Sequence, residues 1–404
     1  AYAAYTSGEE KIYRRMDSVL DFASAHPANG LSIGALPYID FNRAGSVTLG
    51  VAPRFGLGPV TVSGNAAYSF GLRHGVGEGG IAVSVLDREN DEGRPLQLSL
   101  RAGLFSMIAS TTTDRTYSRL MNSLVAGGLH SDYYDYYLKE GKNVGVDFVD
   151  DRVRVGVTAE MARHASLPVT TNRSLLTNKA FRPNPEITPG NYQLLQADFT
   201  MGSAANFITI APLDVIDVTL GATGVAGREQ GSGTAFESFE ALGSLLIPTF
   251  RTGYNPMTIT LFGAAGAGTA TLPPQYQFRL RTSASTIGKA GGFVSAPTGV
   301  YGGTEYIATG GEFNTTDLPW RALGLPTYHG RGPELILAGA TGRFRQRNSV
   351  GYLPTGDNWY SEVGFGLGRI PLFVTDLLSL RFDMRFGIGP LGKFNANVGL
   401  ITPL

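Results

Sequence analysis

The sequence predicts an all-β protein, a sixteen-stranded antiparallel transmembrane β-barrel with a short N-terminal helix. Apolar and polar residues alternate along most of the chain, as from Leu378 to Gly389, and successive side chains of a strand point to opposite faces. Charged residues make up only 16% of the chain, and its 54 glycines are roughly twice the usual ~7% share. The stretch that comes nearest to a transmembrane helix, residues 255–278, carries no charge, but it is rich in Gly, Thr and Pro and also alternates. A membrane crossing by this chain therefore requires a closed barrel rather than a helix.

The chain is expected to have two parts, a helical lead-in over residues 1–30 on the periplasmic side and a barrel over residues 31–404. A helix is predicted over residues 7–25, because Ser7 and Glu10 form a capping box and apolar residues recur on one helical face. The first residues lack the basic and apolar regions of a signal peptide, which indicates a mature chain or a piece of a longer one.

The alternation predicts sixteen strands, and an even number suits a barrel closed by antiparallel neighbours. A strand of eleven residues tilted by ~40° reaches about 25 Å, the height of the apolar band of an outer-membrane barrel. The expected strands lie near residues 31–40, 46–55, 60–72, 80–87, 96–108, 144–150, 152–163, 192–201, 213–225, 236–248, 256–270, 303–313, 333–345, 358–369, 377–388 and 393–402.

The lengths of the links between strands give a second, independent signal. Links after odd-numbered strands are often long and polar, at residues 109–143, 163–191, 271–302 and 346–357, and most of the others are short. The link over residues 314–332 is an exception, since it is long although it follows an even-numbered strand, where most links are short. Long loops on one rim and short turns on the other are typical of bacterial outer-membrane barrels. A large soluble β-sandwich or propeller would alternate too, but the low charge content favours the membrane barrel.

Composition and motifs exclude several function classes. Basic and acidic residues balance at 33 each, which argues against a nucleic-acid partner. The chain has no cysteine, so disulfides, thiolate metal sites and cysteine nucleophiles are excluded. Its five histidines are scattered without metal or catalytic spacing, and neither a nucleophile elbow nor a phosphate-binding loop occurs. We therefore expect no enzyme, no cofactor and no metal.

Several short motifs, spread over most of the chain, carry a resemblance to a known family. They lie at residues 132–137, 181–187, 272–274, 278–280, 291–293, 301–304, 312–314, 318–320, 360–364 and 380–383. Together they resemble the surface-antigen (BamA/TamA-type) superfamily of outer-membrane barrels. The similarity is greater to a branch of unassigned function that a carboxypeptidase-regulatory-like domain often precedes.

This resemblance implies that the sixth loop, residues 271–302, folds into the barrel lumen. In the superfamily the tip of this loop carries an Arg-Gly-aromatic motif, whose arginine reaches an acidic residue on the inner wall. Gly292 and Phe293 match the motif, but Gly291 stands in the place of the arginine and Lys289 is the nearest cation. Lys289 is therefore the candidate substitute, with Glu362 and Asp383 as candidate inner-wall partners.

Two further groups of residues are candidates for function. The first is a set of charges on the lumen side of the predicted strands: Arg152, Arg154, Glu160, Glu362, Arg381, Asp383 and Arg385. These charges either tune the passage of anions or pair across strands and hold the sixth loop. The second is the run of Tyr133, Tyr134, Tyr136 and Tyr137. It predicts either a partner or glycan surface, or an aromatic girdle or a loop packed over the barrel mouth.

The leading function hypothesis is a barrel of the surface-antigen type that transports or assembles protein or lipid at the bacterial outer membrane. The first alternative is a structural or partner-binding subunit of an envelope complex, and the second is a gated pore for small solutes. The expected partners are the lipid bilayer of the outer membrane and other envelope proteins. Substrate and direction of transport stay open.

Overall fold

The computed structural model describes thirteen stretches of the chain. They are residues 31–89, 95–111, 119–150, 152–177, 179–202, 216–251, 256–280, 293–296, 301–327, 332–347, 359–371, 379–389 and 392–401. The helix predicted over residues 7–25 and the whole lead-in lie outside these stretches, so the division of the chain into two parts stays a prediction.

The described residues form one antiparallel sheet of 16 strands in which the order in space is the order in the chain. The first eight are β1 (Leu31–Asn42), β2 (Ser46–Leu57), β3 (Val60–Ser69), β4 (His74–Glu89), β5 (Pro95–Ser110), β6 (Tyr136–Val149), β7 (Val153–Ser166) and β8 (Gly190–Gly202). The others are β9 (Asp217–Glu229), β10 (Ala235–Arg251), β11 (Pro256–Gly268), β14 (Glu305–Asn314), β15 (Glu334–Arg345), β16 (Trp359–Pro371), β17 (Ser379–Ile388) and β18 (Phe394–Ile401). All sixteen predicted strands are thereby confirmed.

Short elements interrupt three of the links. The link between β5 and β6 holds α2 (Arg119–Leu129), and the link between β14 and β15 holds α3 (Leu318–Ala322). The link between β11 and β14 holds η2 (Pro274–Tyr276) and the paired short strands β12 (Phe278–Arg279) and β13 (Gly302–Gly303). In the described part of the chain, no helix has both the length and the apolarity needed to span a membrane.

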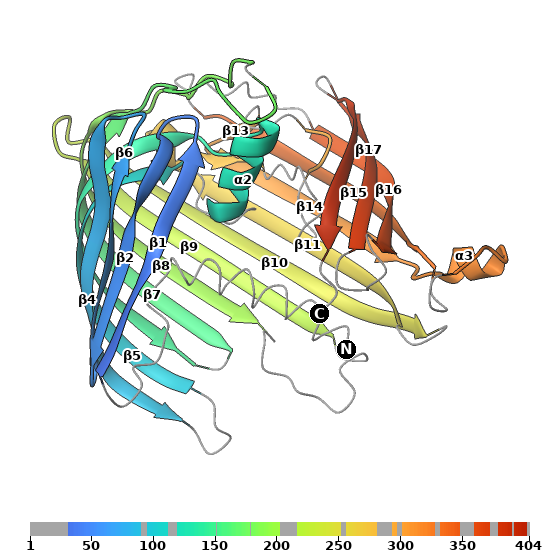
Figure 1. The fold of residues 1–404 in the computed structure, drawn as a ribbon, viewed down its shortest axis with the longest axis horizontal. Coiled ribbons are helices and arrows are strands. Elements are labelled where there is room, and N and C mark those ends of the chain that lie inside the picture. The colour runs from blue at the N-terminus through green and yellow to red at the C-terminus, as the bar shows by residue number, and fades with distance from the viewer. Residues whose placement is uncertain are drawn as a thin grey trace.

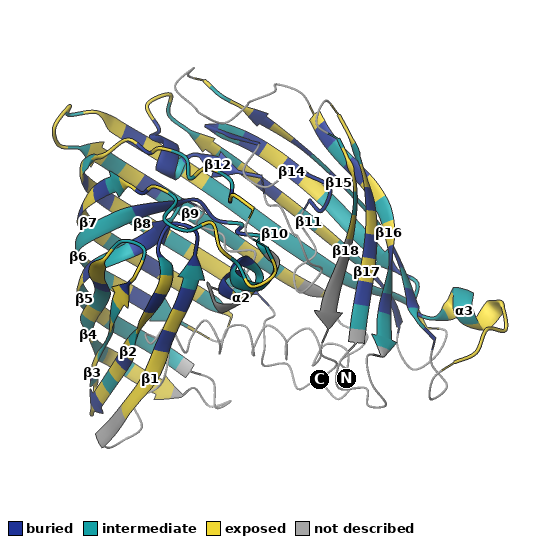
Figure 2. Cartoon of the chain, turned by 45° about the horizontal axis from the view of Figure 1, so that its top comes forward, coloured by how far each residue is buried: buried dark blue, intermediate teal, exposed yellow. Residues whose placement is uncertain are grey.

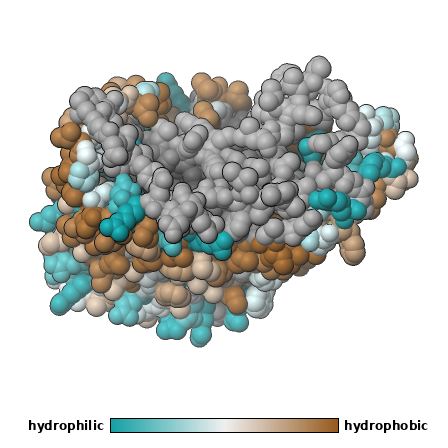
Figure 3. Space-filling model, turned by 90° about the horizontal axis from the view of Figure 1, so that it is seen from below, coloured by the Kyte–Doolittle hydropathy of each residue, from teal (hydrophilic) through white to brown (hydrophobic). Residues whose placement is uncertain are grey.

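The sheet curls, so it has a concave inner face and a convex outer face (Figure 1). Along β17 the outward-pointing Phe382, Met384 and Phe386 are exposed, whereas the intervening charged residues are buried. Figure 2 shows this alternation as stripes along the strands, and Figure 3 shows hydrophobic residues gathered along the flank. On β17 the apolar face therefore points outward and the charged face inward, the reverse of the arrangement in a soluble domain.

Two strands begin earlier than the alternation predicts. β4 begins at His74 instead of near residue 80, and β6 begins at Tyr136 instead of near residue 144. The added residues are rich in glycine in β4 and in charged and polar residues in β6, so they lack a regular apolar face. They are strands because each pairs in register with both neighbours.

The strands β1 and β18 stand at the two ends of the pairing order. At one end of β1, helix α2 covers the strand (Figures 1 and 2). The hydroxyl of Ser123 in α2 accepts a hydrogen bond from the backbone N–H of Phe41 at 2.9 Å and donates one to the carboxylate of Asp40. A side chain of α2 thus satisfies a backbone donor of this edge strand.

Candidate functional site

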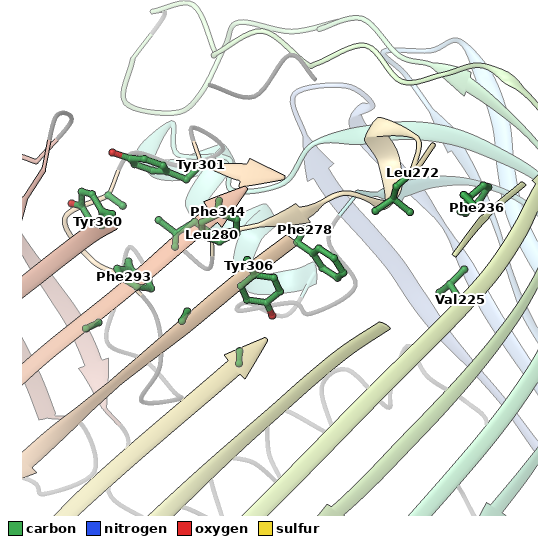
Figure 4. Packing of buried hydrophobic residues seen from close by; sticks show 14 of the residues in the cluster. Val225, Phe236, Leu272, Phe278, Leu280, Phe293, Tyr301, Tyr306, Phe344 and Tyr360 are labelled. Atoms are coloured by element: carbon green, nitrogen blue, oxygen red, sulfur yellow. The ribbon is translucent and has the colours of Figure 1, made fainter. Parts of the chain in front are cut away.

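The inner face carries a continuous apolar surface that the link between β11 and β14 covers. We call this link, residues 269–304, loop six; it contains the predicted sixth loop, residues 271–302. Figure 4 shows the cluster, with Tyr301, Phe293 and Tyr360 at one end and Leu272 with Phe236 at the other. Loop six contributes Leu272, Phe278, Leu280, Phe293, Ala296 and Tyr301, and strands β8 to β16 contribute Tyr192, Leu194, Val225, Phe236, Ala264, Tyr306, Ala308, Ala340, Phe344 and Tyr360. Since full burial of one large apolar side chain contributes about 1.5–3 kcal/mol, this contact holds the loop inside the sheet.

One end of loop six is bound by the carboxylate of Glu362 on β16. The backbone N–H groups of Val294 and Ser295 donate to Glu362 at 3.0 and 2.8 Å, and the Ser295 hydroxyl donates to it at 2.7 Å. That hydroxyl also lies 2.7 Å from the hydroxyl of Tyr360. The carbonyl of Val294 accepts a hydrogen bond from the side-chain amide of Asn395 on β18 at 2.7 Å. Five polar contacts therefore fix a two-residue segment of the loop against the inner wall.

The other end of loop six docks through Gln275. Its amide donates to the carbonyl of Thr188 at 3.1 Å and accepts from the Thr188 N–H at 3.2 Å, and it lies 3.4 Å from Nδ1 of His164. The ring of His164 is stacked on Tyr192, with centroids 4.6 Å apart. Next to Gln275, the ring of Tyr276 lies against that of Phe236, with centroids 5.3 Å apart. The loop is thus held at both ends, near β7 and near β16.

Beyond the loop contacts, the inner wall carries a buried cluster of two acids and two arginines. Arg381 pairs with Glu312 and Asp383, both at 2.8 Å. Arg385 pairs with Asp383 at 2.9 Å and with Glu312 at 3.2 Å. Arg381, Asp383 and Arg385 all come from β17, whereas Glu312 comes from β14. The two formal charges of each sign balance within the cluster.

Small residues on the intervening strands make this cluster possible. Glu312 faces Ala338, Ala338 faces Gly364, and Gly364 faces Arg385. Three strand spacings of about 4.8 Å separate β14 from β17, so the side chains of Glu312 and of the arginines must together cross ~14 Å of wall. A Cβ at Gly364 would lie 2.9 Å from Cδ of Arg385, and one at Gly366 would lie 2.8 Å from an Asp383 oxygen. The two glycines keep this path free.

A second buried ionic cluster lies at the rim that carries the long loops. Arg43, in the turn between β1 and β2, is fully buried. Its guanidinium pairs with Asp135 at 2.7 Å and Asp132 at 3.4 Å, and its backbone N–H donates to Asp132 at 2.9 Å. The guanidinium also donates to the carbonyl of Tyr134, and its Cζ lies 5.6 Å from the ring centroid of Tyr136. The β1–β2 turn is therefore tied to the β5–β6 link.

The link between β7 and β8 joins the same cluster. Arg182 donates to the carboxylate of Asp135 and to the carbonyl of Tyr134. Burial alone would raise the pKa of Asp135, but the positive charges of Arg182, Arg279 and Arg43 outweigh it and lower this pKa. Since Arg279 belongs to loop six, the cluster joins four segments that are distant in the sequence.

The candidate charges of the sequence analysis have different environments. Glu160 pairs with Lys139 at 2.7 Å on the inner face, and Arg154 lies 3.7 Å from Asp147 with about half of its side chain exposed. Arg152 is exposed where β7 begins. Arg381 and Arg385 pair with Asp383 on their own strand and with Glu312 of β14, and Glu362 accepts hydrogen bonds from loop six. Whether these charges tune the passage of anions or only hold the structure stays a prediction.

The candidate loop tip is described only in part. Lys289, Gly291 and Gly292 lie outside the described residues, so the lysine substitution for the family's arginine stays a prediction. Phe293 is 1% exposed and lies 5.8 Å from the ring of Tyr360. Glu362 was predicted as an acid for a loop cation, but in the described part of the loop it accepts backbone and hydroxyl donors.

The tyrosine run lies inside the protein. Tyr134, Tyr136 and Tyr137 are 6%, 6% and 4% exposed, and Tyr133 is half-buried. A partner surface needs exposed rings, so in this structure the first three do not offer one. Tyr136 and Tyr137 begin β6, and Tyr133 and Tyr134 lie in the link before it. The function of the run stays a prediction.

Sequence reasoning missed several residues of this interior. Arg43 stands in a short turn and Gln275 in the short helix η2 of loop six, where no periodicity marks an inward side chain. Asn395 was recognised only as a polar residue of an alternating strand. The described residues contain no group of three or more acidic or histidine side chains that could hold a metal ion.

Comparison of the sequence with protein-family models and with curated proteins gives no match. The structure is similar to that of BamA from Haemophilus ducreyi lacking POTRA domains 1–3, with a TM-score of 0.50 and 10% identity over 92% of this chain and 70% of that chain. The likeness is one of fold. CdiB from Acinetobacter baumannii is similar with a TM-score of 0.39 and 11% identity over 92% and 59% of the two chains. Pseudomonas aeruginosa OpdK, solved with vanillate, has a TM-score of 0.41 and 11% identity over 94% and 89%.

The predicted surface-antigen resemblance is thus supported at the level of fold, since BamA is among the structural neighbours. Membership of the superfamily, and of the branch with a preceding regulatory-like domain, stays a prediction because no sequence comparison matches.

Proposed function

We propose that this chain is an integral barrel of the bacterial outer membrane, closed between β1 and β18, whose outer face contacts lipid. The support is the size of the exposed apolar surface. Outward-pointing residues from distant strands, such as Leu49, Val144, Leu261 and Val363, are 43%, 57%, 45% and 52% exposed. Monomeric soluble proteins rarely expose a contiguous apolar patch of more than a few hundred Å². A lipid bilayer covers such a face without cost.

The same proposal gives the barrel an orientation. α2, β12 and β13 lie in long links on one rim, and α3 lies toward the other. In outer-membrane barrels long loops are extracellular and short turns are periplasmic. We therefore place the clusters around Arg43 and loop six on the extracellular side.

We further propose that the barrel transports or assembles protein or lipid rather than conducting small solutes. The observation that carries this is loop six, whose described apolar residues are buried on the inner wall and whose Val294 and Ser295 are bound at Glu362. A passive pore needs a free water path, and a loop held by a buried apolar cluster and a carboxylate opposes one. Release of such a loop requires work from a substrate or partner.

Conductance in planar bilayers tests this proposal. We expect the purified protein to show no large, steady channels. Glu362→Ala removes the acceptor of three donors from Val294 and Ser295, so this variant should open more often. Glu78→Gln is the matched control, because Glu78 is an inner-face acid that binds Asn65 on β3, outside loop six.

Large steady channels in the unmodified protein would contradict the occluded barrel and favour the gated pore for small solutes. Co-purification of a stoichiometric envelope protein in mild detergent would favour a subunit of an envelope complex.

A further inference from the structure

The link between β14 and β15 forms a small ordered projection that the occluded interior does not explain. We call residues 317–327, which include α3, the α3 knob. It projects sideways from the sheet in both views of the ribbon (Figures 1 and 2). Its Leu318, Leu323 and Leu325 are 38%, 74% and 38% exposed. Three exposed leucines in so short a segment give the knob an apolar surface.

The exposure of these leucines is built into the backbone. Asp317 pairs with Arg321 at 2.9 Å and accepts the N–H of Gly332 at 3.1 Å, which closes the base of the knob. The N–H of Leu323 donates to the carbonyl of Pro319 at 3.1 Å. Gly324 then ends the helix with φ +63°, a left-handed conformation that favours glycine. The leucines therefore stand outward on a fixed frame.

Trp320 is arranged for an apolar environment. Its Nε1–H donates to the carbonyl of Pro326 at 2.7 Å, within the knob itself. Its ring rests against the backbone of Gly332, where an added Cβ would lie 2.4 Å from Cδ1 of the indole. The only polar group of the indole is thus satisfied, and the half-buried ring can enter lipid without losing a hydrogen bond.

The knob also continues the outer face. It follows β14 and precedes β15, whose outward-pointing Leu337 is 46% exposed. Its charged side chains Asp317 and Arg321 pair with each other, so no unpaired charge of the knob opposes contact with lipid. Tryptophan is enriched at membrane interfaces, where an amphipathic ring fits the headgroup level.

We propose that the α3 knob is a membrane anchor that inserts Trp320, Leu323 and Leu325 into the interfacial layer of the periplasmic leaflet. This inference rests on the proposed outer-membrane location. A protein partner for the same leucines is the competing occupant, but the sideways projection and the continuity with the outer face favour lipid.

Fluorescence quenching tests the anchor, because the chain has only 2 tryptophans, Trp320 and Trp359. Trp359→Phe leaves Trp320 as the sole emitter, and Trp320→Phe leaves Trp359, which is 51% exposed on the outer face of β16. Each variant is reconstituted into phosphatidylcholine vesicles with bromine placed either near the headgroups or deep in the acyl chains. We expect Trp320 to lose more emission to the shallow bromine than to the deep one, and little to aqueous iodide.

Trp359 distinguishes failure of the α3 anchor from failure of the proposed membrane location. If Trp359 is quenched by brominated lipid and Trp320 is quenched only by iodide, the anchor is overturned while the outer-membrane location stands. If neither tryptophan is quenched by lipid, the location and the anchor both fail. A Leu323→Asn change in the Trp359→Phe background should reduce lipid quenching of Trp320 and shift its emission to the red, and an unchanged spectrum would contradict the anchor.

Discussion

At the residue scale, Arg43 shows how a charge can be placed inside the protein at little cost. It is fully buried, yet it faces two carboxylates, a carbonyl and an aromatic ring. Taking charges out of water is expensive, and only good geometry with further hydrogen bonds compensates. The contribution of this residue therefore depends on the whole cluster. Its loss leaves Asp132 without the arginine that faces it, and leaves Asp135 with only Arg182 and Arg279 nearby.

Arg43→Met should lower the free energy of unfolding by about 3–5 kcal/mol, the usual cost of breaking a buried ion pair from one side. The measurement is the urea midpoint of the folded, reconstituted protein. Arg154→Met is the matched control, because Arg154 also faces an aspartate but has 53% of its side chain exposed. Exposed pairs contribute about 0–1 kcal/mol, so equal effects of the two variants would contradict the buried cluster.

The pKa of Asp135 predicts how this cluster responds to acid. Neighbouring arginines hold this pKa below its usual value of 3.8. A carboxyl with a lowered pKa stabilises the folded state above its unfolded pKa and loses that contribution as the pH falls through the folded one. The protection factors of residues 131–137 against hydrogen exchange should therefore stay high from neutral pH down to about pH 4 and fall only below it.

Asp135→Asn provides the control for the acid response. It removes the titrating group, so protection of residues 131–137 should become less dependent on pH in the acid range. Loss of protection already near pH 6 in the unmodified protein would assign the response to another group.

At the scale of elements, the path of the arginines across β15 and β16 explains why glycine stands at position 364. A Cβ at Gly364 would lie 2.0 Å from the carbonyl oxygen of Met384 and 2.9 Å from Cδ of Arg385. Gly364→Val should therefore destabilise the sheet by about 1–3 kcal/mol, the cost typical of overpacking. Gly263→Val in β11 is the matched control, because nothing lies within 4 Å of an added Cβ there. The readout is the temperature at which each variant loses its folded gel mobility, and equal temperatures would contradict the packed path.

The elements differ in how well the sequence predicts them. The core of β17 could be read directly, because Arg381, Asp383 and Arg385 alternate with large apolar residues. The start of β6 could not, since residues 136–143 mix tyrosine, charge and glycine without a period, and pairing with β5 and β7 decides their state. Helix α2 was missed within a long polar link, because its stability comes from tertiary contacts such as Ser123 with β1.

The candidate site, too, could be predicted from the sequence only in part. Alternation placed Glu362 on the inner face, and the resemblance predicted that loop six enters the interior near it. Neither could predict that Val294 and Ser295 bind Glu362, because a backbone N–H has no sequence signature. The Arg43 cluster was missed because it joins segments that are distant in the sequence and that only the tertiary structure brings together.

At the scale of the whole molecule, the outer face is apolar and the inner face of β6 is polar. A charge should therefore destabilise the protein much more at an outward position than at the neighbouring inward one. Val144 is 57% exposed on the outer face of β6, and Asn143 points inward and faces Glu160. Val144→Lys should destabilise the membrane-inserted state by about 2–4 kcal/mol if it lies near the bilayer midplane. Asn143→Lys should have a small effect, and folding yields into vesicles measure both. A larger loss for Asn143→Lys would reverse the assigned faces.

The central claim is that loop six is held inside the sheet against β16 and β17, and an engineered disulfide tests it most directly. A Cβ at Gly387 would lie 2.9 Å from Oγ of Ser295, and the far end of Tyr360 must shift slightly to admit it. The chain has no cysteine of its own, so Ser295→Cys with Gly387→Cys gives no background. Ser295→Cys with Gly263→Cys is the control pair. We predict that mild oxidation joins the first pair in the reconstituted protein, as peptide mass spectrometry would show, and leaves the control pair free. Free, maleimide-reactive cysteines at positions 295 and 387 would contradict the account.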